Sequence, residues 1–259
     1  MQLRYVNLYV GYALNKKPPY YELFNDRERI RFNDGANFIS NYLSKAIRKY
    51  HFQTDNTFKF IGVHPTLSKE TYLERPYDAA VMAYARITNE EYENYLSDSN
   101  LINRYEFYLN ILERGYAIVS QHKSIPVDSL LECHNMFRKE GYKNEWIFKK
   151  FCIPNYSIKV ELRCLFSTFD FKLEINAYDK KTSELIANGL IMRTAPNELC
   201  YDYKFKSVKI IENNIVIYNF LGHRSFVIDI PKLLNGEVEV EYSEYGKDDD
   251  AKSIEELIW

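Results

Sequence analysis

The chain has 259 residues, of which 46% are hydrophobic and 27% are charged, and its formal net charge at pH 7 is −2. This composition is typical of a globular protein and excludes wholesale disorder, and no apolar run reaches the ~18 residues that a membrane span requires. The first fourteen residues alternate apolar and polar side chains, unlike a secretory signal, so we expect a cytoplasmic protein with no membrane partner.

The charge is distributed unevenly along the chain. Residues 231–259 contain nine acids and three lysines, a net charge of −6, which leaves +4 for residues 1–230. An acidic cluster of this kind repels phosphate and favours a basic partner, so we expect no nucleic acid partner. The 23 tyrosines have two explanations, an AT-rich genome and a protein interface, and we favour the first.

The cysteines and histidines form no metal-ligating or redox motif. The four cysteines, Cys133, Cys152, Cys164 and Cys200, lack the spacing of a zinc or thioredoxin-like site, and we interpret them as buried apolar residues. The five histidines contain no His-x-x-x-His pair, and the nine glycines form no phosphate-binding loop. We therefore expect no metal and no cofactor.

The N-terminal half reads as a mixture of strands and amphipathic helices. Asn-Asp and Asp-Gly sequences predict an exposed loop over residues 24–35, and apolar residues at three- and four-residue steps predict a helix over 36–50, capped by Asn33 or Asp34. The remaining predictions are strands over 3–14, 57–63 and 79–87, a capping-box helix from Thr88 to Tyr95, helices over 101–120 and 127–140, and a helical turn over 144–152.

Beyond Pro154 the apolar period changes from 3.6 to 2. Alternation predicts strands over 158–166, 169–177, 184–193, 203–212, 215–221, 226–230 and 237–242, with a two-residue turn at Asn213-Asn214. The predicted fold is α+β, with a helix-rich half, residues 1–153, packed closely against an antiparallel β-meander or sandwich, residues 154–259, that carries an acidic tail. The two halves could be a single domain.

Two groups of residues are weak candidates for chemistry. Cys133 and His134 are adjacent, but neighbouring helix residues point about 100° apart, so we interpret them as ordinary helix positions. His223 and Arg224 follow Gly222 between two strands and could bind an anion, with Glu161 as a nearby carboxylate in a crevice between the halves. A plain polar loop and a solvent-facing salt bridge are the simpler interpretations.

The most distinctive predicted surface is an acidic strand near the C-terminus. A period of two places Glu237, Glu239 and Glu241 on one face and Val238, Val240 and Tyr242 on the other. We favour the interpretation that this charge protects an edge strand from sheet-to-sheet aggregation, and the alternative is a docking face for a basic protein. The candidate partner-binding residues are Glu237, Glu239, Glu241, Tyr242, Glu244, Tyr245, Asp248, Asp249 and Asp250.

In the character of the whole chain, this sequence resembles bacterial immunity proteins of polymorphic toxin systems. No matched motif carries the resemblance, so it assigns no role to any single residue. It implies a non-catalytic cytoplasmic binding protein, a monomer or weak dimer, that occludes the active site of a cognate toxin with a basic surface. The alternatives are an enzyme or small-ligand binder that uses the crevice between the halves, and a structural or regulatory subunit.

Overall fold

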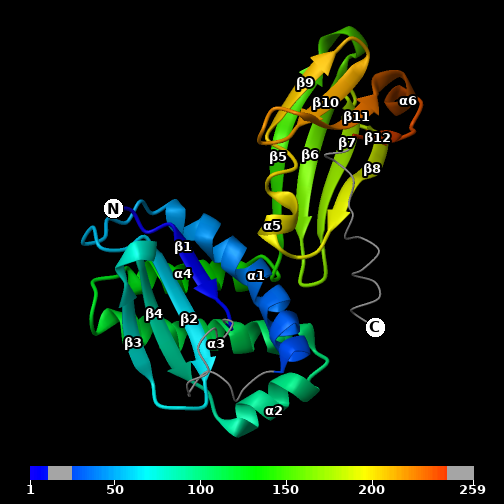
Figure 1. Ribbon diagram of the computed structural model, residues 1–259. Helices are drawn as coiled ribbons and strands as arrows, with labels where there is room; N and C mark the ends of the chain where they lie inside the picture. The colour runs from blue at the N-terminus through cyan, green and yellow to red at the C-terminus, as the bar shows by residue number, and fades with distance from the viewer. Residues whose placement is uncertain (11–24, 244–259) are drawn as a thin grey trace. The chain divides into compact units, whose positions relative to one another are not determined.

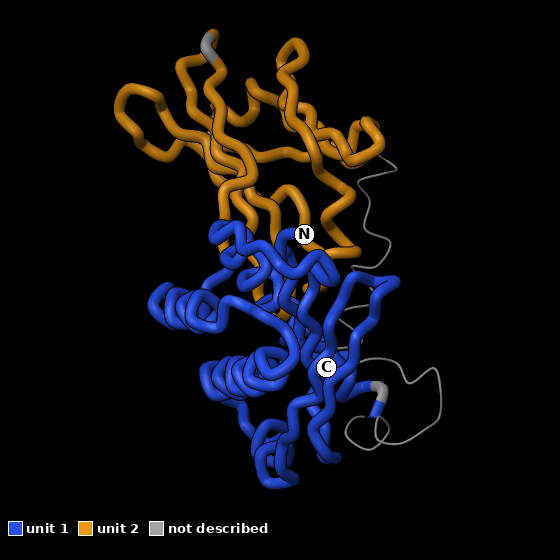
Figure 2. The backbone as a smooth tube through the Cα atoms, turned by 90° about the vertical axis from the view of Figure 1, so that its left-hand side faces the viewer, with its two compact units in different colours: residues 1–144 blue, residues 145–259 orange. Residues whose placement is uncertain are grey.

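The computed structural model describes residues 1–10 and 25–243, and the chain forms two compact units, Met1–Asn144 and Glu145–Trp259 (Figure 2). The first unit combines helices with a mixed sheet, and the described part of the second consists mostly of strands (Figure 1). The predicted α+β class is therefore confirmed. The two units divide earlier in the chain than the expected boundary at Pro154.

The sheet of the first unit has the strand order β1-β2-β4-β3. Strands β1, β2 and β4 are parallel, and β3 is antiparallel to β4. Helices α1 and α3 cover one face of the sheet, and α4 packs on both helices (Figure 1). The elements of this unit are β1 (Tyr5–Leu8), α1 (Asp26–Arg48), β2 (Phe60–Thr66), β3 (Thr71–Arg75), β4 (Ala80–Arg86), α2 (Asn89–Ser97), α3 (Leu101–Ser120) and α4 (Val127–Lys139).

Helix α1 begins ten residues before the expected start, so the predicted loop over 24–35 is wrong for the described residues. Asn25 is the N-cap, and with Glu28 it forms a capping box in which each side chain accepts a hydrogen bond from the other residue's backbone N–H. Asn33 bonds both backbone groups of Val10 through its side-chain amide, at 2.8 and 3.0 Å. A favourable cap and these tertiary contacts outweigh the turn preference of the Asn-Asp-Gly sequence.

Three predicted helices of the first unit are confirmed. Helix α2 has the expected capping box of Thr88 and Glu91, α3 spans 101–120, and α4 ends before Gly141, which adopts a left-handed φ of +69°. Gly115 lies within α3, where the helix approaches Val63 of β2 closely. The short strand β3 escaped prediction because its side chains are mostly exposed and follow no clear alternation.

The second unit begins with a strand where a helical turn was expected, so the helical prediction over 144–152 is wrong. Residues Asn144–Ile153 form β5. Trp146 and Phe148 alternate along it and contact Phe171 and Phe205, with ring centroids 5.9 and 4.9 Å apart. Aromatic side chains at a spacing of two favour a strand packed against an aromatic core, and this packing outweighs the local helical pattern.

The rest of the second unit consists of two sequential meanders, with strand orders β5-β6-β7-β8 and β12-β11-β10-β9. The predicted antiparallel meander is thus confirmed, and register pairs such as Arg163 opposite Glu174 place opposite charges across strands. The elements are β6 (Ile158–Phe166), β7 (Phe171–Asp179), β8 (Leu185–Thr194), α5 (Glu198–Tyr201), β9 (Ser207–Ile211), β10 (Asn214–Tyr218), β11 (Arg224–Asp229), α6 (Ile230–Leu234) and β12 (Val240–Tyr242).

Several boundaries in the second unit differ from the expected ones. The hairpin between β9 and β10 turns at Glu212-Asn213, one residue earlier than expected, and Glu212 adopts φ of +53°. The strand expected over 203–212 is shorter, since β9 covers only Ser207–Ile211. The short helix α5 precedes it and packs against the core through Tyr201, whose ring centroid lies 3.6 Å from that of Phe171. Helix α6 replaces the expected loop after β11 and is capped by Asp229.

Candidate functional site

The expected acidic face lies at the end of one sheet in the second unit. Glu237, Glu239 and Glu241 are all exposed and alternate with the half-buried Val238 and Val240. Only residues 240–242 form the strand β12, which pairs with β11 and ends the strand order of its sheet. Glu241 therefore lies on the edge strand of this sheet, and Glu237 and Glu239 lie on the segment that leads into it.

One of the three glutamates is partly neutralised. Glu239 forms an ion pair with Lys232 of α6, and this hydrogen bond raises the pKa of the Lys232 ammonium, with a smaller effect from Glu237. The backbone N–H of Glu237 donates to the carbonyl of Lys232 at 3.1 Å, which ties the segment before β12 to the helix. Glu241 lies opposite Val227 of β11 and points to solvent.

Tyr242 ends the described acidic strand and remains partly exposed. Its ring meets that of Phe226 edge to face, with centroids 5.9 Å apart. Ser243 then donates its backbone N–H to Ser225 at 3.2 Å, which fixes this end of the strand beside β11. The other predicted partner-binding residues, Glu244, Tyr245, Asp248, Asp249 and Asp250, lie outside the described residues.

The three residues of the alternative ligand site lie on different sheets of the second unit. Glu161 of β6 is nearly buried and forms ion pairs with Lys159 and Lys150, at 2.9 and 3.0 Å, which lower the pKa of its carboxyl group. It is therefore less exposed than a solvent-facing strand position predicts. His223 and Arg224 lie at the turn between β10 and β11, where both are exposed.

Cys133 and His134 do not form a catalytic pair. The thiol of Cys133 is buried, and burial raises its pKa to about 11, so it is protonated at neutral pH. The imidazole of His134 is fully buried, with Nε2 3.1 Å from the hydroxyl of Tyr116 and Nδ1 3.1 Å from the carboxylate of Glu113. These contacts join α4 to α3, so both residues have structural roles.

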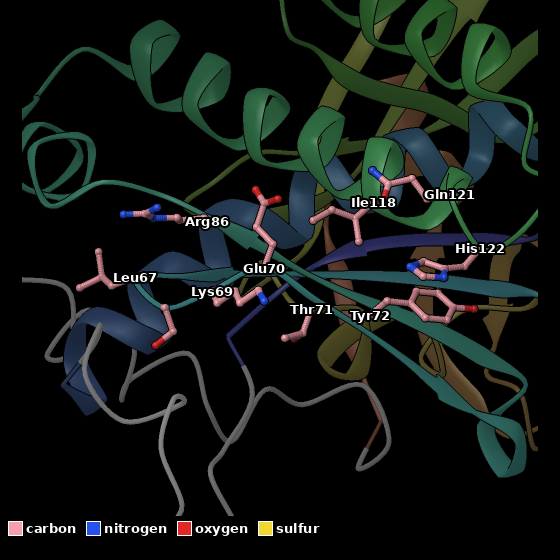
Figure 3. Close-up of a pocket in the computed structure, with 10 residues that line it drawn as sticks. Leu67, Lys69, Glu70, Thr71, Tyr72, Arg86, Ile118, Gln121 and His122 are labelled. Carbon is pink, nitrogen blue, oxygen red and sulfur yellow. The ribbon is translucent and has the colours of Figure 1, made fainter.

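A polar pocket that was not predicted from the sequence lies in the first unit. Its volume is about 710 Å³, and it lies between the loop that joins β2 to β3 and the C-terminal end of α3 (Figure 3). The His122 ring stacks on Tyr72 with centroids 4.3 Å apart, which forms one wall. The pocket is lined by Leu67, Ser68, Lys69, Glu70, Thr71, Tyr72, Arg86, Ile118, Gln121 and His122.

The chemistry of this pocket suits a small polar molecule. Lys69 and Arg86 bring positive charge, Glu70 brings one negative charge, and Ser68 and Thr71 add hydroxyl groups. None of the residues singled out from the sequence lines it. The only sequence signal would have been the cluster of hydroxyl and charged residues after Pro65, which is also typical of an ordinary surface loop.

Other findings concern metals, membranes and known proteins. Among the described residues, no group of three or more His, Cys, Asp or Glu side chains is arranged to hold a metal ion. Within residues 1–10 and 25–243, every helix is too short or too polar to cross a membrane.

No protein-family model, curated protein or solved structure matches the chain.

Proposed function

We propose that the chain is a non-catalytic cytoplasmic binding protein that neutralises a cognate bacterial toxin by covering its active site. The observation that carries the proposal is a succession of three exposed glutamates, with Glu241 on the edge strand β12 and Glu237 and Glu239 on the segment that leads into it. Repulsion between neighbouring like charges slightly destabilises the free protein, and a basic partner would cancel this repulsion. The attraction between opposite charges would also raise the rate of association.

The surroundings of the acidic strand also support a protein interface. Tyr242, which follows Glu241 on the opposite face of β12, offers a partly exposed aromatic ring, and aromatic residues are enriched at interfaces. The pair of Lys232 with Glu239 reduces the net charge at the middle of the row, so Glu237 and Glu241 would carry most of the attraction. The competing explanation is that these charges only prevent the edge strand from pairing with strands of other molecules.

A direct test uses the protein encoded by the gene immediately upstream. A large secreted protein with a variable C-terminal domain is expected there, and co-expression of this chain should protect cells from that domain. The double variant Glu237→Gln/Glu241→Gln should protect less, whereas Glu90→Gln/Glu93→Gln, which makes the same charge change on α2, should protect fully. An upstream metabolic enzyme, or equal protection by both variants, would contradict the proposal.

A second candidate function is favoured by the pocket of the first unit. Its volume lies within the range of ligand sites in proteins, and Lys69 and Arg86 suit a small molecule with a carboxylate or phosphate group. A specific ligand would raise the melting temperature, because it binds only the folded state. A thermal-shift screen of carboxylates and sugar phosphates tests this, with Arg86→Gln expected to remove any shift.

A further inference from the structure

The turn between β10 and β11 exposes two large apolar side chains side by side in the sequence. Phe220 and Leu221 are 63% and 78% exposed, and Tyr203, whose carbonyl accepts the N–H of Phe220 at 3.0 Å, is 52% exposed. Single exposed apolar residues are ordinary, but a group at the tip of a turn marks an interaction site. Neither the acidic strand nor the pocket of the first unit accounts for this group.

The backbone N–H groups of this turn are all hydrogen-bonded within the protein. Asn219 accepts the N–H groups of both Leu221 and His223 on its side-chain oxygen, each at 2.9 Å. The N–H of Gly222 reaches the Asn219 carbonyl at 3.1 Å, and the N–H of Asn219 reaches the His223 carbonyl at 2.9 Å. Since Phe220 is also bonded, all five N–H groups of residues 219–223 have partners within the protein. Burial of the turn would therefore leave none of these donors unsatisfied.

Positive charge borders the apolar tip. The ammonium of Lys206 lies 4.6 Å from the centroid of the Phe220 ring, and Arg224 follows the turn as an exposed residue. From Glu198 to Arg224 four cations outnumber three acids, in contrast to the net −6 of residues 231–259. A tip with apolar side chains and adjacent cations combines the two features that hold proteins at anionic membrane surfaces.

We propose that the turn formed by residues 219–223 docks this protein on membranes that contain anionic lipids. Phe220 and Leu221 enter the region between headgroups and acyl chains, Tyr203 lies at the headgroup level, and Lys206 and Arg224 contact lipid phosphates. This site shares no residue with the acidic strand, which ends beside it where the N–H of Ser243 donates to the carbonyl of Ser225, next to Arg224. It departs from the sequence-based expectation of no membrane partner because the exposure of the turn is visible only in the folded structure. The anionic cytoplasmic leaflet is the membrane surface that a cytoplasmic protein would meet.

Vesicle co-sedimentation tests the proposal. The full chain should sediment with phosphatidylcholine vesicles containing 30% phosphatidylglycerol, at least tenfold more than with pure phosphatidylcholine, and less as salt is raised. Phe220→Ser/Leu221→Ser should lower the bound fraction at least tenfold, and Lys206→Gln severalfold. The control Phe169→Ser/Leu185→Ser removes two side chains of similar exposure, 53% and 56%, and should bind like the original chain.

A second measurement covers the case in which a variant folds poorly. Phe220→Trp should shift its emission to shorter wavelength with anionic vesicles and be quenched by brominated lipids, beyond the change of the original chain. The proposal is overturned if the original chain does not sediment with anionic vesicles, if both double variants bind alike, or if Phe220→Trp is insensitive to them. Loss of binding to a protein partner, with vesicle binding absent, would identify the turn as a protein interface and would also overturn it.

Discussion

Gly115 of α3 lies so close to Val63 of β2 that a Cβ atom at residue 115 would stand 2.4 Å from the Cγ2 atom of Val63. This approach presses the middle of the helix onto the sheet, in the part of the first unit where Val63 is fully buried. The missing side chain is therefore a requirement of the packing and overrides the ~1 kcal/mol cost of glycine within a helix.

We predict that Gly115→Ala lowers the free energy of unfolding by about 1–2 kcal/mol. The gain in helix propensity is smaller than the typical cost of about 1–3 kcal/mol for overpacking a core. Chemical denaturation measures the change. The double variant Val63→Ala/Gly115→Ala lacks both Cγ atoms that clash with the new methyl group and keeps only the Cβ atom, 3.1 Å away. The two substitutions together should therefore cost less stability than the sum of their separate costs. A neutral or stabilising Gly115→Ala would contradict the observed contact.

Asp34 should make the stability of the first unit fall as the pH rises. Burial raises the pKa of its carboxyl group to about 6, whereas the unfolded chain has a pKa of about 3.9. The folded state thus binds the proton more tightly, so the contribution is fully present below about pH 4 and is lost as the pH rises through 6. Asp34→Asn should be more stable than the original chain at pH 8, by up to about 2 kcal/mol, and this advantage should disappear at pH 4. A stability difference that does not change with pH would show that ionisation of the Asp34 carboxyl group is not its cause.

Glu91 should act in the opposite direction. The pKa of its carboxyl group is lowered to about 2, chiefly by the hydrogen bond from Arg114 and further by the backbone N–H of Thr88. Its contribution is therefore present above about pH 4.5 and is lost as the pH falls toward 2. We expect Glu91→Gln to be less stable than the original chain at pH 6 and equally stable near pH 2, as measured by urea unfolding at each pH. A constant difference across this range would contradict the assignment.

The cysteines should differ in reactivity toward a thiol reagent in the native protein. Cys152 is exposed and should react first, Cys200 is half-buried and should react more slowly, and Cys133 and Cys164 are buried. Because burial raises the pKa of Cys133 to about 11, its thiolate population at pH 8 is very small. Labelling at pH 8 followed by peptide mass spectrometry should find Cys133 and Cys164 modified only after denaturation. Early modification of Cys133 would contradict its buried position.

The elements that could be predicted from the sequence are those whose local signals agree with their packing. Helix α2 has a complete capping box, and α3 has a long apolar face. The apolar residues of β6 and β7 recur at every second position and are buried, although Glu161 and Asn176 between them are buried as well. The expectation that all four cysteines are buried is right for Cys133 and Cys164 and wrong for Cys152, which is exposed, and for Cys200, which is half-buried.

The errors arise where contacts distant in the sequence decide the structure. Gly35 belongs to α1 because it packs beneath Tyr108, where a Cβ atom would stand 2.4 Å from the hydroxyl oxygen. No local pattern around Asp34-Gly35 reveals that neighbour, so a turn was predicted. In the same way, the pocket beside His122 depends on the fold that brings β3 to the end of α3, and the exposure of Phe220 depends on the turn that Asn219 holds.

Calorimetric titration with the upstream-encoded toxin domain tests most directly the claim that the acidic strand recognises a basic protein. For the original chain the dissociation constant should rise steeply with salt. For Glu237→Gln/Glu241→Gln it should be at least tenfold higher and depend less on salt. An unchanged dissociation constant and an unchanged salt dependence in this variant would contradict the claim and leave the glutamates as charges that only protect a sheet edge.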